Sequence, residues 1–146
     1  MEPAFLDELS KRGHKITRQR RAVLLVMAEG RLLLTPWEVY ERARRRCPGL
    51  GLTTVYRCME LFSQLGYVRR VHRDGDCRGY ARSRQGHRHH LICSKCRRVA
   101  EVEGCDIDLL VRTAEEHTGF KVERHWLELF GQCPSCRARA EAPAGG

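Results

Sequence analysis

The stretch LTTVYRCMELFSQLGYVRRVHRDGDCRGYAR, residues 52–82, carries the strongest structural signal in this 146-residue chain. Apolar residues recur every three or four positions between 55 and 65, which is the spacing of one face of a helix. We expect this helix to begin at Thr53 or Thr54 and to end at Gly66.

Two short strand-like runs, residues 67–73 and 77–82, follow this helix. They flank Asp74-Gly75, a dipeptide typical of tight hairpin turns. The end of the amino-terminal half is therefore predicted to be a two-stranded antiparallel hairpin.

Further helices are predicted upstream. Residues 4–12 have helical spacing, and Thr17 is a good N-cap for a helix that runs to about Ala28. The run Thr35-Pro36-Trp37-Glu38 is a capping box with proline at the first helical position, and it opens a helix to about Arg46. Three helices followed by a two-stranded wing are the pattern of a winged helix-turn-helix, which we predict for residues 1–82.

The carboxy-terminal half has a mixed pattern of strands and one helix. We predict a hinge linker over residues 83–88 and a small α/β domain over residues 89–137, so the fold class is α/β (α+β) overall. The expected elements are strands at 90–93 and 98–104, a helix at 106–117 and a long strand at 120–131. The tail, residues 138–146, is expected to be disordered.

Two Cys-x-x-Cys pairs, Cys93/Cys96 and Cys133/Cys136, each follow a strand-like run. This spacing lets two thiolates from one tight turn bind the same ion, and two such pairs predict a closed, four-cysteine structural zinc site. A redox pair is the alternative, but the sequence lacks the βαβ context of a thioredoxin-like motif. A closed shell leaves no position for a reactive water, and the His-x-Glu motif of zinc deaminases is absent, so we predict no enzymatic activity.

The net charge of +9 is concentrated in the first part of the chain. Residues 1–92 hold 19 Lys and Arg against 9 Asp and Glu, whereas residues 93–146 hold 8 against 9. This asymmetry favours a basic half that faces double-stranded DNA, although an Arg-rich composition throughout the source proteome is the alternative. The predicted DNA-contacting residues are Lys15, Arg18, Arg20, Thr54, Tyr56, Arg57, Arg69 and Arg70.

The segments LTTVYRCMELFSQLGYVRR (52–70) and GHRHHLICSKC (86–96), with TGFKVERHWLELFGQCPSC (118–136), resemble the ferric uptake regulator family of bacterial metal-dependent repressors. The resemblance spans nearly the whole chain. It implies an amino-terminal winged helix and a carboxy-terminal dimerisation domain. It also implies that Lys15, Tyr56 and Arg57 contact operator DNA.

A second, regulatory metal site is expected in the dimerisation domain. Histidines precede the first cysteine pair, and strand alternation places His87 and His89 on one side and His90 on the other. The resemblance implies that Asp108 and His125 complete a site with His87 and His89. His90 is left for a hinge sensor site, which Cys77 and His72 from the wing would complete, although this departs from the family pattern.

The donor set of three histidines with one carboxylate suits zinc. We therefore expect a homodimeric, zinc-sensing repressor that binds operator DNA when its regulatory metal is bound. Sensing of iron, manganese, nickel or peroxide within the same family is the alternative. A zinc-ribbon scaffold or metal store without DNA binding is the alternative from a different class. No stretch of the sequence reaches the roughly 20 apolar residues of a membrane span, and reduced cysteines suit a cytoplasmic protein.

Overall fold

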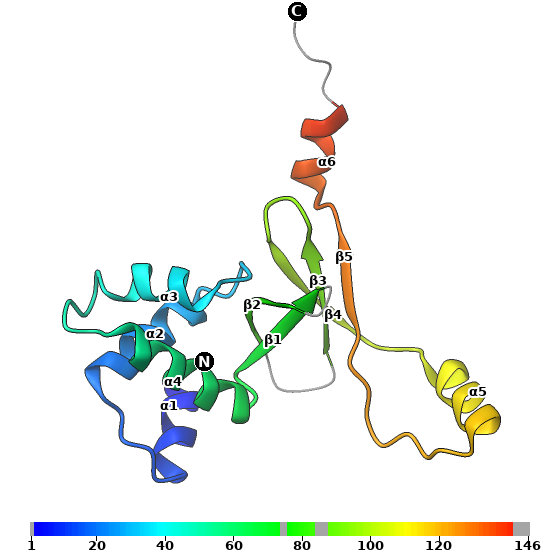
Figure 1. Ribbon diagram of the computed structural model, residues 1–146, viewed down its shortest axis with the longest axis horizontal. Coiled ribbons are helices and arrows are strands. Elements are labelled where there is room, and N and C mark those ends of the chain that lie inside the picture. Colours follow the sequence, from blue (N-terminus) through cyan, green and yellow to red (C-terminus); the bar gives the residue numbers. More distant parts are fainter. Residues whose placement is uncertain (1, 74–75, 84–87, 142–146) are drawn as a thin grey trace, which may run out of the picture.

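The computed structural model describes residues 2–73, 76–83 and 88–141. Four helices open the chain: α1 (Glu2–Lys11), α2 (Arg18–Ala28), α3 (Pro36–Ala43) and α4 (Leu52–Gln64). The hairpin β1 (Val68–Arg73) and β2 (Asp76–Arg82) follows them, so the predicted winged helix-turn-helix pattern is present (Figure 1). No helix in these ranges is long and apolar enough to cross a membrane.

Two helices, α2 and α3, begin at the N-cap residues that the sequence predicts. Thr17 accepts a hydrogen bond from the backbone N–H of Arg20, and Thr35 and Glu38 form the reciprocal capping box. At α4 the prediction was wrong, because the helix begins at Leu52 and Gly51 is its N-cap without a side-chain hydrogen bond. The carbonyl of Gly51 already accepts from the N–H groups of Thr54 and Val55, which places both threonines inside the first turn.

The core of the amino-terminal domain lies between α1, α2 and α4. Leu9, Val23, Met59 and Phe62 are buried there, and the ring of Phe5 packs edge-on against Phe62. These residues are the apolar faces that the helical spacing predicts, and their burial is the main source of the domain's stability.

The carboxy-terminal domain is built on a three-stranded sheet of order β4-β3-β5. Strand β3 (Arg88–Cys93) pairs antiparallel with β4 (Val99–Glu103) and parallel with β5 (Glu128–Gly131). Helix α5 (Asp108–Thr118) stands apart from the sheet at the end of two connecting segments, and α6 (Pro134–Glu141) follows β5 at the end of the sheet (Figure 1).

Three boundaries in this domain differ from the prediction. Arg88 begins β3 rather than ending a linker, and residues 84–87 lie outside the described residues. The strand expected over 120–131 spans only 128–131, because β5 pairs with β3 only from the His90–Glu128 position onward. The tail prediction was wrong for residues 138–141, which continue α6 in a run of good helix formers, and residues 142–146 are not described.

A small apolar cluster joins the two domains. Leu33 from the segment before α3, Val71 and Ala81 from the hairpin, and Ile92 from β3 are all buried against one another. The winged helix and the carboxy-terminal sheet are therefore in direct contact through side chains from both.

Candidate functional site

Four cysteines meet at the end of the sheet. Cys93 ends β3 and Cys96 lies in the following turn, while Cys133 and Cys136 come from the start of α6. Their sulfur atoms all lie within 4.8 Å of one another, and Cys96 Sγ is 3.7 Å from Cys133 Sγ. Tetrahedral zinc with Zn–S bonds of about 2.3 Å separates neighbouring sulfurs by about 3.8 Å. The arrangement fits a structural zinc ion, as the sequence predicts.

Backbone N–H groups lower the pKa of two of these thiols, Cys93 and Cys133, and so favour their thiolate forms. Hydrogen bonds from the backbone N–H groups of Cys96 and then Cys133 lower the pKa of Cys93 to about 6. In contrast, the pKa of Cys136 is raised to about 12, first by its hydrogen bond with Cys133 and then by that with Cys96. Four adjacent thiolates repel one another, so the cluster can ionise fully only around a cation.

A second cluster of potential metal ligands is built on the same sheet. His89 from β3, Cys105 from the segment after β4 and His125 from the segment before β5 bring their ligand atoms within 4.8 Å of one another. Cys105 Sγ lies 3.4 Å from His125 Nε2, and the rings of His89 and His125 stack with centroids 5.3 Å apart.

This second cluster only partly matches the predicted one. His89 and His125 come together as expected, but Asp108 is exposed at the start of α5 and is not in the cluster, and His87 lies outside the described residues. Sequence reasoning missed Cys105. Its position directly after a strand, three residues before the predicted ligand Asp108, was the available signal.

The predicted hinge site is not assembled by the described residues. His90 is 1% exposed, and burial, followed by the charge of Arg69, lowers its pKa. His72 is exposed on β1, and the side chain of Cys77 lies outside the described residues. Within the described ranges, neither His90 nor His72 belongs to a group of three potential metal ligands.

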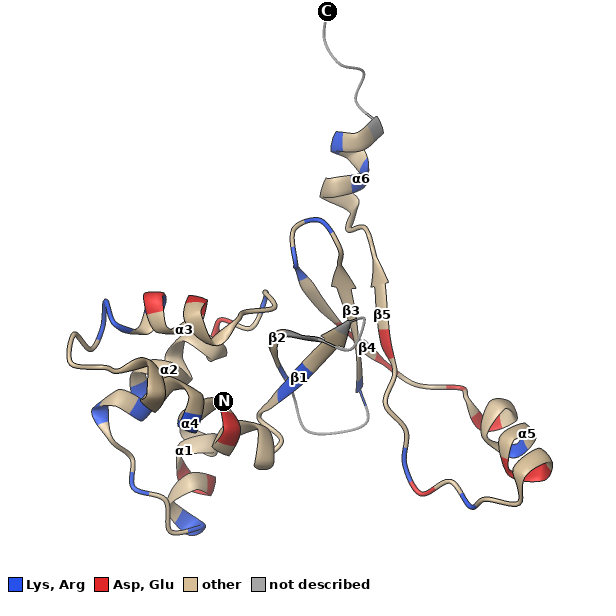
Figure 2. Cartoon of the chain, viewed as in Figure 1, with Lys and Arg blue, Asp and Glu red and all other residues tan. Residues whose placement is uncertain are grey.

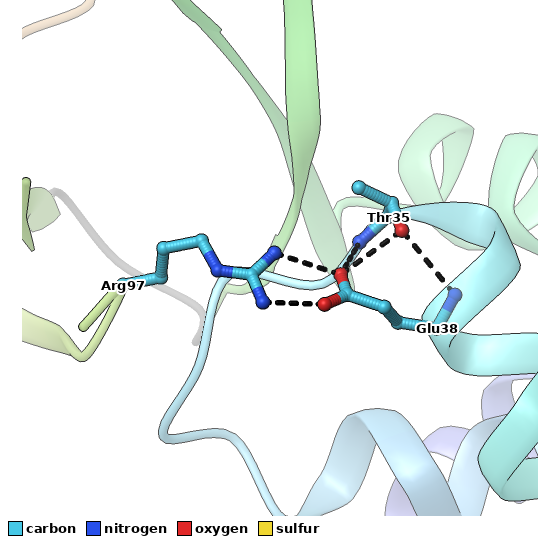
Figure 3. A network of polar contacts seen from close by, with 3 residues as sticks. All are labelled: Thr35, Glu38 and Arg97. Carbon is cyan, nitrogen blue, oxygen red and sulfur yellow. Dashed lines mark hydrogen bonds and ion pairs between the residues drawn. The ribbon is translucent and has the colours of Figure 1, made fainter. Parts of the chain in front are cut away.

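In place of the predicted hinge metal site, an ion pair lies at the contact between the two domains. Arg97, in the turn that follows Cys96, reaches both carboxylate oxygens of Glu38 at the start of α3, with Nη1 2.9 Å from Oε2 (Figure 3). The hydrogen bond from Arg97 is the largest cause that lowers the pKa of Glu38 to about 2. The carbonyl of Arg97 also accepts from the N–H of Leu33 at 2.9 Å, so backbone and side chain dock the turn together.

Basic residues gather on the winged helix, along the α1–α2 connection, the start of α2 and β1 (Figure 2). Lys15, Arg18 and Arg57 are exposed, and Tyr56 is 52% exposed near the amino end of α4. The exposure of these four side chains is compatible with their predicted contacts with DNA, which remain a prediction.

Of the other predicted DNA contacts, Arg70 is exposed and the rest are half-buried, and the three arginines among them donate hydrogen bonds within the protein. Arg20 donates to the carbonyl of Lys15, and Arg69 donates to the carbonyl of Arg88 at 3.4 Å. Arg70 donates to the hydroxyl of Tyr80 at 3.0 Å, and Thr54 is half-buried.

The ferric uptake regulator family model matches residues 11–130 of the chain. The zinc uptake regulation protein of Mycobacterium tuberculosis is 32% identical over 130 residues, which is 89% of this chain and 100% of the relative. The ferric uptake regulation protein of Legionella pneumophila is 33% identical over 132 residues, 90% of this chain and 97% of the relative. A solved zinc-bound manganese uptake regulator superimposes with a TM-score of 0.64 at 34% identity, covering 88% of this chain and 98% of that one. With its winged helix, its four-cysteine cluster and these matches, the chain belongs to the ferric uptake regulator family of metal-responsive transcriptional regulators.

Proposed function

We propose that the protein is a repressor that binds operator DNA as a homodimer when a regulatory zinc ion is bound. The observation that carries this proposal is the direct docking of a winged helix, with Tyr56 and Arg57 exposed, onto a sheet that holds a His/Cys ligand cluster. Metal binding can control DNA binding only if it favours one arrangement of the winged helices over another. The contact between the domains supplies the necessary physical connection.

The surface of the carboxy-terminal domain supports a homodimer. Leu109 and Leu110 of α5 are 72% and 67% exposed, Phe120 is 77% exposed and Trp126 is 67% exposed. None of the residues of α5 is buried. Covering such side chains contributes about 1.5–3 kcal/mol each. A second copy of the chain is the partner we propose, because a twofold dimer would pair two winged helices with the two half-sites of a palindromic operator.

Zinc is the proposed effector because of the ligands, not because of sequence identity. The zinc-regulation and iron-regulation relatives are 32% and 33% identical, so identity does not separate the two metals. Thiolate and imidazole ligands favour zinc, whereas iron(II) and manganese(II) sites use more carboxylate and water. The described second cluster contains two imidazoles and a thiol.

The test is operator binding at fixed salt, with a duplex selected from a random library by the zinc-loaded protein. Protein with only its four-cysteine zinc is compared with protein that also carries the second zinc. We expect the second zinc to raise affinity by roughly 5–150-fold, the usual range of coupling between sites. Salt is held constant because phosphate contacts make affinity fall steeply with ionic strength. Equal affinity of the two forms would overturn the proposal.

Exchange of the metal tests the choice of zinc. The same duplex is titrated with protein whose second site holds manganese(II) or iron(II), prepared without oxygen. We expect zinc to support binding at the lowest free metal concentration. A lower threshold for manganese or iron would assign the protein to another branch of the family.

A further inference from the structure

The strongest unassigned feature is the thiol of Cys105. Cys105 lies two residues after the end of β4, is half-buried, and has its Sγ 3.4 Å from Nε2 of His125. The helix α5 begins three residues later, so the thiol is held between two regular elements. The sequence assigned this cysteine no partner, and the four-cysteine cluster does not include it.

The geometry around the sulfur matches a metal shell. Zinc with a Zn–S bond of about 2.3 Å and a Zn–N bond of about 2.0 Å separates sulfur and nitrogen by about 3.5 Å in a tetrahedron. The observed separation of 3.4 Å is close to this value, and His89 supplies a third ligand atom within 4.8 Å of both. A simple thiol–imidazole hydrogen bond would also bring Cys105 and His125 together, but it would not require the second imidazole beside them.

The burial of His89 adds to this argument. Two histidines on β3 are nearly inaccessible to solvent: His89 is 3% exposed and His90 is 1% exposed. His89 faces Cys105 and His125, while the next residue, His90, lies near Arg69 and Glu101 on the other side of the strand. Because successive side chains of a strand point to opposite faces, His89 faces the other two potential ligands whereas His90 faces charged groups.

We propose that Cys105 is a ligand of the regulatory metal, together with His89 and His125. This deepens the proposed function, because a thiolate in place of a carboxylate selects zinc and other soft ions over iron(II) and manganese(II). The three ligands leave one tetrahedral position for a water molecule or a further side chain. Cys105 is thus the residue that determines which metal the protein senses.

Cobalt(II) is the probe, because thiolate bound to cobalt gives a charge-transfer absorption in the near ultraviolet that imidazole and carboxylate do not give. Protein that retains its four-cysteine zinc is titrated with cobalt(II), and a chromogenic chelator confirms that no zinc is released. We expect one cobalt ion per protomer and a charge-transfer band that rises with it. Cobalt binding without this band, or no cobalt binding, would overturn the proposal.

The variant C105S removes the thiolate and keeps the size of the side chain. We expect it to lose the charge-transfer band and to bind cobalt and zinc at least tenfold more weakly. The matched control is C47S, which removes a half-buried cysteine of the winged helix and should leave the band and the affinity unchanged. A full band in C105S would assign the thiolate to another cysteine and overturn the proposal.

A measurement on the unmodified sequence covers the case in which C105S does not fold. Iodoacetamide labelling followed by mass spectrometry compares Cys105 with Cys47 before and after zinc is added to the second site. Zinc should slow the labelling of Cys105 at least tenfold and leave that of Cys47 unchanged. Equal labelling rates of Cys105 with and without zinc would contradict its role as a ligand.

The DNA-binding assay separates this inference from the proposed function. If Cys105-dependent metal binding is found but operator affinity does not respond to it, the ligand assignment stands and the proposed function fails. If operator affinity responds to zinc equally in C105S and in the unmodified protein, the proposed function stands and the ligand assignment fails.

Discussion

Arg97 and Glu38 join the zinc-binding turn to the first turn of α3 by a two-pronged ion pair across 59 residues of sequence. Glu38 also completes the capping box of α3 with Thr35, so one carboxylate serves the helix start and the domain contact (Figure 3). Arg97 has a φ of 61°, a left-handed conformation that non-glycine residues adopt rarely. The same turn therefore holds Cys96 for the metal and aims Arg97 at the winged helix.

The variant E38Q should destabilise the protein at neutral pH by about 1 kcal/mol, since the pair is partly exposed and solvent screens it. The pKa of Glu38 is lowered from 4.5 to about 2. Its stabilising contribution is therefore fully present above about pH 4.5 and is lost as the pH falls through about 2. Urea unfolding of both proteins should show a difference that shrinks over this range. The control is E41Q, because the exposed ion pair of Glu41 with Arg44 should contribute little to stability. A difference in the free energy of unfolding between E38Q and the unmodified protein that stays constant from pH 7 to pH 2 would contradict this role of Glu38.

Replacement of Arg97 should loosen the domain contact without unfolding either domain. In R97A we expect faster hydrogen exchange at the amide of Leu33, which donates to the carbonyl of Arg97, and at the amide of Val99, which donates to the carbonyl of Arg31. R97K keeps the charge but not the two-pronged geometry, so it should give an intermediate rate. The amide of Val23 in the core of α2 serves as the internal reference. No change at Leu33 and Val99 would show that the apolar cluster and the backbone hydrogen bonds hold the domains together without the ion pair.

Loss of one structural cysteine should remove zinc and destabilise the carboxy-terminal domain together. In C96S we expect one zinc fewer per protomer and a Tm several degrees lower, because metal binding and folding are coupled in such sites. Zinc release should also become easier as the pH falls, since protons compete for the thiolates. Metal analysis and calorimetry measure both effects. C47S is the control, and an unchanged zinc content in C96S would show that three cysteines suffice.

The exposed basic residues of the winged helix should divide into base-reading and phosphate-contacting groups. R57A, at the amino-terminal part of α4, should weaken operator binding by about 1–3 kcal/mol and relax sequence preference. K15A should weaken binding to all duplexes similarly and reduce the salt slope by about 1. Fluorescence anisotropy at several salt concentrations measures both. R139A on α6, an exposed arginine outside the proposed dimer surface, is the control. A loss in R139A equal to that in R57A would place the DNA elsewhere.

A charge introduced on α5 should separate the proposed dimer. Leu110 is 67% exposed, so L110D should not disturb the core of the protomer but should shift sedimentation from dimer toward monomer. The control is I16D, which changes a 42% exposed apolar residue in the α1–α2 connection. Operator affinity should fall with dimer content in L110D. A stable L110D dimer would place the interface on another surface.

Local signals account for what the sequence predicts well. The N-cap at Thr17, the capping box at Thr35, the apolar spacing of α4 and the turn signal Asp74-Gly75 all act between residues close in sequence. The helices and the hairpin strands that they predict are found. The two Cys-x-x-Cys pairs are local signals too, because a single turn holds each pair. Four thiols in two such pairs predict a zinc ion that both pairs share. Elements whose extent depends on a neighbour were less well predicted: β5 is shorter than its apolar pattern because it pairs with β3 only from the His90–Glu128 position onward.

The place of Cys105 in the second metal cluster was decided by tertiary structure alone. His89, Cys105 and His125 come from three segments, and only the pairing of β3 with β4 and β5 brings them within ligand distance. The sequence determined by itself that the chain has a winged helix and a four-cysteine site. It could not place Cys105 beside His125, or Arg97 beside Glu38, because contacts between residues far apart in the chain leave no periodic or spacing signal. They depend on the path of the whole backbone.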